Sequence, residues 1–166
     1  MRNAFNGYAS YPQIQFHEKA AMITRQNRAP FFDDWVRLRS KLKGEEHKDT
    51  LLAANNYASS FITQERFEEA KSLMCKMMPV ARRILGESRE LTLRMKWTYA
   101  QSLYKDASAT LNDLREAEST LKDAVRLARR VLGSTHPTVV QMENSLQNAR
   151  AILGARESGR EVKIIR

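Results

Sequence analysis

Apolar residues recur at helical spacing over most of this 166-residue chain. They mark one face from Asp49 to Thr63 and one face from Phe67 to Leu85, because residues three, four and seven apart meet on the same side of a helix. Residues 64–66 leave room for only a short turn, so the pattern predicts an antiparallel helix pair. The expected inward side chains are Leu51, Ala54, Tyr57, Ala58, Phe61, Phe67, Ala70, Leu73, Met74, Met77 and Ala81.

The same pattern returns on both sides of this pair. A second pair is expected from about Glu90 to Asp106 and from about Asn112 to Leu132, and a single helix from Pro137 to Leu153. Upstream, residues 12–28 and 33–42 predict a degenerate first pair. The chain is therefore expected to be all-α, with about seven helices.

A glycine turn repeats between the pairs. Ala81-Arg-Arg-Ile-Leu-Gly86 matches Ala128-Arg-Arg-Val-Leu-Gly133 and, more loosely, Arg39-Ser-Lys-Leu-Lys-Gly44, so the glycines lie 42 and then 47 residues apart. Basic residues suit the negative end of a helix dipole, and the glycine is expected to cap the helix in the left-handed conformation. The five extra residues of the later repeat predict a longer turn, or a longer helix, over 105–112.

Three segments carry a family resemblance: Asn55-Asn56-Tyr57-Ala58, Phe67-Glu-Glu-Ala70 and Leu132-Gly-Ser-Thr-His-Pro137. They resemble tetratricopeptide repeat (TPR) proteins, in particular the 42-residue variety of kinesin light chains, over about residues 33–153. The resemblance implies a right-handed solenoid of antiparallel helix pairs. It also implies small residues where helices approach closely, at Ala58, Ala100, Ala70 and Ala117. Gln147 departs from the pattern, which indicates a terminal capping helix.

The pattern divides the chain into four parts. Residues 1–11 form an N-terminal extension and 12–43 the degenerate first pair. Residues 44–153 form the TPR-like repeats with the capping helix, and 154–166 a charged C-terminal tail outside the stack.

Composition limits the cellular compartment and the kind of partner that we expect. A single cysteine, Cys75, excludes an internal disulfide and fits the cytoplasm or another reducing intracellular compartment, and Arg2 in an N-terminus without acidic residues leaves organellar import open. No run of eighteen apolar residues occurs, so no membrane span is expected. A net charge of +9 favours acidic partners.

No constellation for catalysis is found. His47 and His136 occupy equivalent turns, which indicates structural roles, and neither a phosphate-binding loop nor a nucleophile elbow is present. Cys75 is expected to be a buried or half-buried inert thiol. We therefore expect a protein that is not an enzyme and that has no metal site and no cofactor.

The resemblance implies that the first helix of each pair lines a concave groove. Trp97 stands where Asn55 and Asn144 stand in the neighbouring repeats, so it is either a binding anchor or a residue covered by the N-terminal helix. Only Asn56 fits the carboxylate clamp that binds chaperone tails, so that ligand is not expected. The predicted groove residues are Asn55, Asn56, Ser59, Arg94, Trp97, Gln101, Tyr104, Asn144 and Asn148.

Two functions remain open at this point. The first is a protein–protein interaction module or scaffold, or a structural subunit of a larger assembly, that binds a protein or an acidic peptide in the groove. The alternative is a basic helical-repeat protein that binds RNA in a ribonucleoprotein particle through one edge. The edge residues, which also simply complement helix dipoles, are Arg82, Arg83, Arg129 and Arg130.

Overall fold

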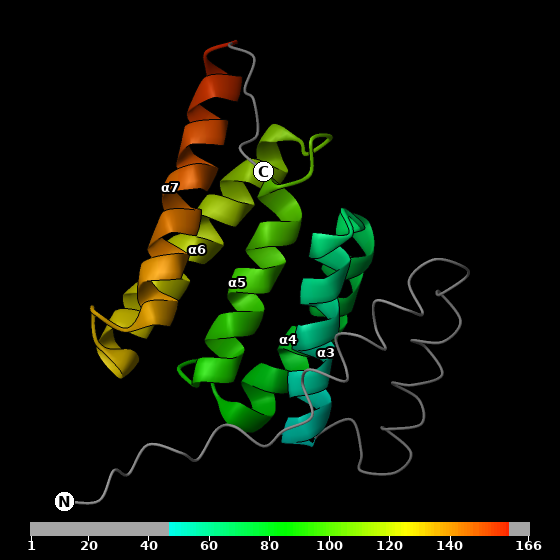
Figure 1. The fold of residues 1–166 in the computed structure, drawn as a ribbon, viewed down its shortest axis with the longest axis vertical. Helices are drawn as coiled ribbons and strands as arrows, with labels where there is room; N and C mark the ends of the chain where they lie inside the picture. The colour runs from blue at the N-terminus through cyan, green and yellow to red at the C-terminus, as the bar shows by residue number, and fades with distance from the viewer. Residues whose placement is uncertain (1–46, 160–166) are drawn as a thin grey trace, which may run out of the picture. The chain divides into compact units, whose positions relative to one another are not determined.

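The computed structural model describes residues 47–159, all of which belong to the second of two compact units, Arg39–Arg166. This part of the chain consists of helices and turns (Figure 1). The N-terminal extension, the degenerate first pair and residues 160–166 of the expected tail lie outside the described residues. The helices are α3 (Lys48–Thr63), α4 (Phe67–Leu85), α5 (Glu90–Tyr104), α6 (Leu111–Leu132) and α7 (Pro137–Glu157).

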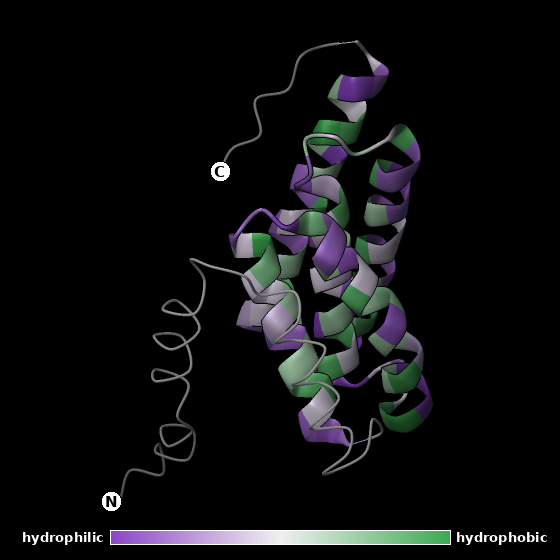
Figure 2. Cartoon of the chain, turned by 90° about the vertical axis from the view of Figure 1, so that its right-hand side faces the viewer, coloured by the Kyte–Doolittle hydropathy of each residue, from purple (hydrophilic) through white to green (hydrophobic). Residues whose placement is uncertain are grey.

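The helices stack as the repeat predicts. Each packs on the next in the chain, and in addition α3 contacts α5 and α5 contacts α7. The first helices α3, α5 and α7 therefore form one layer, with α5 in the middle, and α4 and α6 form the other (Figure 1). Hydrophobic and hydrophilic stretches alternate along each helix, as an amphipathic stack requires (Figure 2).

Small residues lie where the helices approach most closely. Ala58, Ala100, Ala70 and Ala117 are all fully buried, which confirms the positions taken from the repeat. Tyr57 is only half-buried, and its ring lies edge-on against Phe61 at a centroid distance of 4.6 Å. Phe67 is likewise half-buried rather than inward. The large side chains that close the core completely include Leu51, Met74, Leu93, Leu103, Leu114 and Leu121.

Both turn histidines cap helices. His47 Nδ1 accepts a hydrogen bond from the Asp49 backbone N–H (3.2 Å), and His136 Nδ1 accepts one from the Thr138 N–H (3.3 Å). Each satisfies one of the N–H groups that the first turn of a helix leaves open. The structural role expected of these histidines is confirmed, and Pro137 occupies the first turn of α7 beside His136.

The glycine turns differ from expectation in one dihedral angle. Gly86 has φ 86° and ψ 165°, and Gly133 has φ 88° and ψ 152°. The positive φ was predicted, but the ψ values place both residues in a region open essentially to glycine alone rather than in the left-handed helical region. The chain therefore leaves each helix extended, and only the N–H of the glycine itself bonds back to the helix, at Arg82 and Arg129 respectively.

The turn between α5 and α6 is lengthened, as the extra residues predicted. Asp106 Oδ1 accepts hydrogen bonds from the backbone N–H and the hydroxyl of Ser108, and Thr110 and Asp113 form a reciprocal capping box that starts α6. Lys71 of α4 reaches the same carboxylate, with Nζ 3.0 Å from Asp113 Oδ1. Hydrogen bonds from Thr110 and Lys71 hold the pKa of Asp113 down to about 2.

The end of α7 corrects a predicted boundary. The helix continues past Leu153 to Glu157, so the first residues of the expected tail belong to the stack. Arg156 donates to the carbonyls of Ala107 (2.6 Å) and Ala109 (3.3 Å), and Glu157 pairs with Arg115 of α6 at 2.9 Å. These contacts hold the last turn of α7 against the α5–α6 turn.

The outer face of α7 is polar. In α3 the face toward the partner helix is formed by Leu51, Ala54, Ala58 and Phe61, all of which are buried. The equivalent residues of α7, at the same repeat spacing, are Val140, Glu143, Gln147 and Arg150; Glu143 is half-buried and the other three are exposed. A polar outer face is the property that terminal repeats of a solenoid need, which supports the capping role predicted from Gln147.

Thr92 of α5 has a buried, unsatisfied hydroxyl, so we expect its replacement by an apolar residue to stabilise the protein. Its side chain is fully buried, and its hydroxyl has no hydrogen-bond partner. The equivalent residue of α7 is Val139, which is also fully buried. Thr92→Val keeps the shape and removes an unpaired polar group, so we expect the free energy of unfolding in urea to rise by about 1 kcal/mol.

Thr98 supplies the matched control on the same helix. It is as well buried, but its hydroxyl donates to Asn55 Oδ1 at 3.0 Å. Thr98→Val leaves that amide oxygen unpaired, so the free energy of unfolding should fall by about 1–2 kcal/mol. Equal effects of the two substitutions would contradict the assignment of Thr92 as the unsatisfied group.

Candidate partner-binding face

The predicted groove residues lie on one layer of the stack, but not all of them reach its surface. Asn56, Ser59, Asn144 and Asn148 are exposed, and Arg94, Trp97 and Gln101 are half-buried. Asn55 and Tyr104 are buried, with 2 % and 3 % of their surface exposed. We call the seven accessible residues, together with Leu52, the A face; they come from α3, α5 and α7.

Asn55 joins two first helices instead of facing a partner. Its side-chain oxygen accepts the Thr98 hydroxyl across the α3–α5 contact. This corrects the prediction that Asn55 lines a groove, because an amide buried to this extent stabilises the stack and cannot meet a ligand without opening it. Thr98 was not predicted, since nothing in the repeat pattern distinguishes it from any other threonine.

Trp97 forms the corresponding interhelical hydrogen bond on the other side of α5. Its indole Nε1–H donates to Ser145 Oγ of α7 at 2.8 Å, and Ser145 is 6 % exposed. Within the described part of the chain, α7 therefore covers one edge of the ring. Tyr104 lies close to the same hydroxyl; burial raises its pKa, and hydrogen bonding with Ser145 and Gln101 acts against that shift.

The A face offers hydrogen bonds and positive charge. The exposed amides of Asn56, Asn144 and Asn148 can each donate to and accept from an extended backbone. Arg94 has no ion pair with any other residue of the described range. An extended segment with acidic side chains complements this arrangement.

One family model matches the chain. It is described as tetratricopeptide repeat and matches residues 106–138, which comprise most of the α5–α6 turn, all of α6 and the turn into α7. This match supports a TPR-type repeat protein. The 42-residue variety inferred from the glycine spacing fits this family. No curated protein matches the sequence.

The predicted basic edge is partly neutralised. All four arginines are exposed at the last turns of α4 and α6. Arg82 pairs with Glu87 at 3.2 Å and Arg129 with Glu143 at 2.6 Å, so carboxylates balance the charges of these two arginines. The first pair joins α4 to the turn that follows it, and the second joins α6 to α7.

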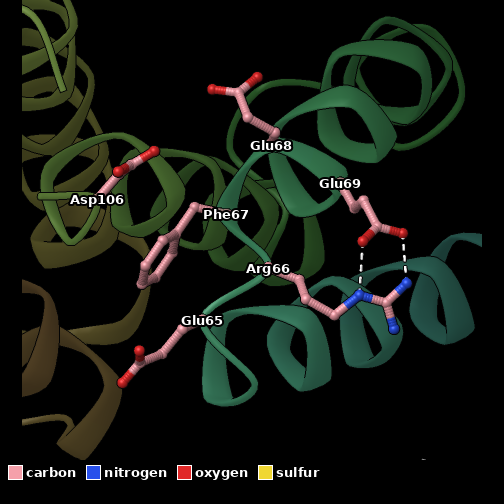
Figure 3. A pocket seen from close by; sticks show the side chains of 6 residues that line it. All are labelled: Glu65, Arg66, Phe67, Glu68, Glu69 and Asp106. Carbon is pink, nitrogen blue, oxygen red and sulfur yellow. Dashed lines mark hydrogen bonds and ion pairs between the residues drawn. The ribbon is translucent and has the colours of Figure 1, made fainter. Parts of the chain in front are cut away.

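A shallow pocket of about 220 Å³ lies away from the A face of the TPR stack, at the turn between α3 and α4 (Figure 3). The Phe67 ring lies between Glu65 and Asp106, while Arg66 and Glu69 pair with each other. Hydrogen bonding to Glu69 raises the pKa of Arg66, whose guanidinium also stacks 4.5 Å from the Phe61 ring centroid. The pair fixes the TPR turn and leaves the other carboxylates facing solvent.

The remaining features considered from the sequence are the cysteine, a metal site and a membrane span. Cys75 is exposed, which corrects the expectation of a buried or half-buried thiol; it lies on α4 beside the hydroxyl of Tyr99. Within residues 47–159 no three metal-binding side chains converge. Nor does any helix of that range have the length and apolar character of a membrane span.

Proposed function

We propose that this protein is a non-enzymatic interaction module whose A face binds an extended, acidic segment of another protein. The observation that carries the proposal is the contrast between first helices: buried polar groups tie α3, α5 and α7 together, while Asn56 on α3 and Asn144 and Asn148 on α7 stay exposed. Side chains that the stack does not need are available to a ligand. Because Arg94 is positively charged, it attracts a negatively charged segment and repels a positively charged one.

The proposed role includes that of a structural subunit in a larger assembly. TPR-type repeats are a scaffold for protein interaction, and the polar outer face of α7 leaves the A face as the surface that combines amides, a cation and an aromatic ring. The basic edge offers a weaker case, since Glu87 and Glu143 already pair with two of its arginines.

Site-specific photocrosslinking in cells tests the proposal. A photoreactive residue replacing Asn148 on the A face should crosslink to a protein, whereas the same residue at Lys122, exposed on α6, should not. Arg94→Glu should reduce the Asn148 crosslink at least about tenfold, because it reverses the charge that the acidic segment meets. Crosslinking at Lys122 but not at Asn148, or crosslinking to RNA alone, would overturn the proposed face.

A further inference from the structure

We propose that Ser145 is a positioning residue: its hydroxyl holds the Trp97 indole in the orientation in which the A face recognises a large apolar side chain of the bound segment. The inference rests on the binding function proposed above, since it assigns a specificity within that same face. It starts from one hydrogen bond, between Trp97 Nε1 and Ser145 Oγ at 2.8 Å.

The bond determines which part of the indole a ligand can meet. Nε1–H is the only polar group of a tryptophan side chain, and here it donates its hydrogen bond to the buried Ser145 hydroxyl. Trp97 is nevertheless half-buried rather than buried, so the part of the ring that remains accessible is hydrocarbon. A ligand group placed there meets an aromatic surface and gains no hydrogen bond.

An aromatic surface attracts either apolar groups or cations, and the charges of α5 decide between them. Arg94 lies on the same helix as Trp97 and Lys105 follows its last residue, and neither has an ion pair within the described part of the chain. A ligand cation at Trp97 would therefore be repelled from nearby. An apolar side chain carries no such penalty and gains from leaving water.

The surroundings limit the apolar contact to one position of the ligand. Asn144 takes the place of Trp97 in the next repeat and is exposed, and Asn148 lies one turn further along α7. These amides favour backbone or polar groups on the α7 side of the apolar one. The segment that fits best is thus extended, with a single large apolar side chain among polar residues.

Selection of peptides by the full-length protein tests the specificity. The probe is a display library of random twelve-residue peptides. We expect the enriched peptides to share one large apolar position, and Trp97→Ala to abolish the preference there. Ser145→Ala should weaken the best peptide about five- to tenfold, and Ser145→Thr, which keeps a hydroxyl, should restore binding to within about twofold.

Ser102 provides the matched control. It is buried to a similar degree, but its hydroxyl donates to the backbone carbonyl of Tyr99 in its own helix at 2.7 Å. Ser102→Ala should leave peptide binding unchanged. The comparison separates loss of the indole contact from the general cost of removing a buried hydroxyl.

Fluorescence reports the orientation of the ring directly. The chain has two tryptophans, Trp35 and Trp97, so Trp35→Phe leaves Trp97 as the sole emitter. In that background Ser145→Ala should shift the emission to the red and increase acrylamide quenching. Ser102→Ala and Ser145→Thr should change neither.

The possible failures point to different conclusions. If the wild-type protein selects no peptide, the binding function and the inference both fail. If peptides are selected that depend on Arg94 and Asn144 but share no apolar position, or if Ser145→Ala binds them as the wild type does, only the inference is overturned. Unchanged fluorescence in Ser145→Ala would likewise overturn the positioning role while leaving the binding function in place.

Discussion

Ala100→Leu is expected to lower the free energy of unfolding by about 2–3 kcal/mol. Ala100 is fully buried on α5, at the position where the repeat places Ala58 in α3. A leucine there must either adopt a strained rotamer or push α5 away from its neighbours, because the space is taken up by the packed helices. Urea unfolding followed by circular dichroism at 222 nm measures the change.

Gln147→Leu is the control at the equivalent position of α7. The three residues are related by the spacing of the glycine turns, 42 and 47 residues, but Gln147 is exposed. Because nothing covers it within the described structure, the substitution should change the free energy of unfolding by no more than about 0.5 kcal/mol. A cost similar to that of Ala100→Leu would show that the outer face of α7 is packed in solution.

The helices themselves could be predicted closely from the sequence. Phe67–Leu85 was placed correctly at both ends, because a short turn precedes it and Arg82, Arg83 and Gly86 follow in the order that ends a helix. The C-terminus of α7 was placed too early, because Leu153-Gly154 resembles the helix ends at Leu85-Gly86 and Leu132-Gly133, yet α7 continues through Gly154. The contacts of Arg156 with carbonyls of the α5–α6 turn are long-range and leave no trace in the local pattern.

The candidate site was predicted less well than the fold, for a related reason. Repeat equivalence treats Asn55, Trp97 and Asn144 as one position, yet their exposure runs from buried through half-buried to exposed. What separates them is the residue opposite on the next first helix: Thr98 for Asn55 and Ser145 for Trp97. Those partners lie 43 and 48 residues away, beyond the reach of any helical period.

The partner of Lys96 could not be predicted from the local pattern either. Removing that partner is expected to have the second large effect on the free energy of unfolding. The Lys96 side chain is 8 % exposed on α5, where α3 has Ala54, and Nζ donates to Glu87 in the preceding turn. Glu87→Ala removes the partner of a cation that is almost completely buried. Breaking a buried pair costs about 3–5 kcal/mol, but Glu87 itself is half-exposed and water can partly replace it, so we expect a loss of about 2 kcal/mol at pH 7.

The double substitution Glu87→Ala with Lys96→Met provides the test of cause. It removes the cation together with its partner and keeps a side chain of similar length, so most of the loss from Glu87→Ala should be recovered. The pH dependence gives a second readout. The hydrogen bond from Lys96, with smaller help from the charges of Lys96 and Arg82, lowers the pKa of Glu87.

A carboxyl group whose pKa is lower in the folded protein stabilises it fully above the unfolded value, about 4.3 for glutamate, and loses that effect as the pH falls further. The cost of Glu87→Ala, measured as the difference in free energy of unfolding from the wild type, should therefore shrink between pH 6 and pH 3. A cost that stays constant over this range would mean that Glu87 contributes by packing rather than by its charge. Full stability of the single variant at pH 7 would show that Lys96 reaches solvent without it.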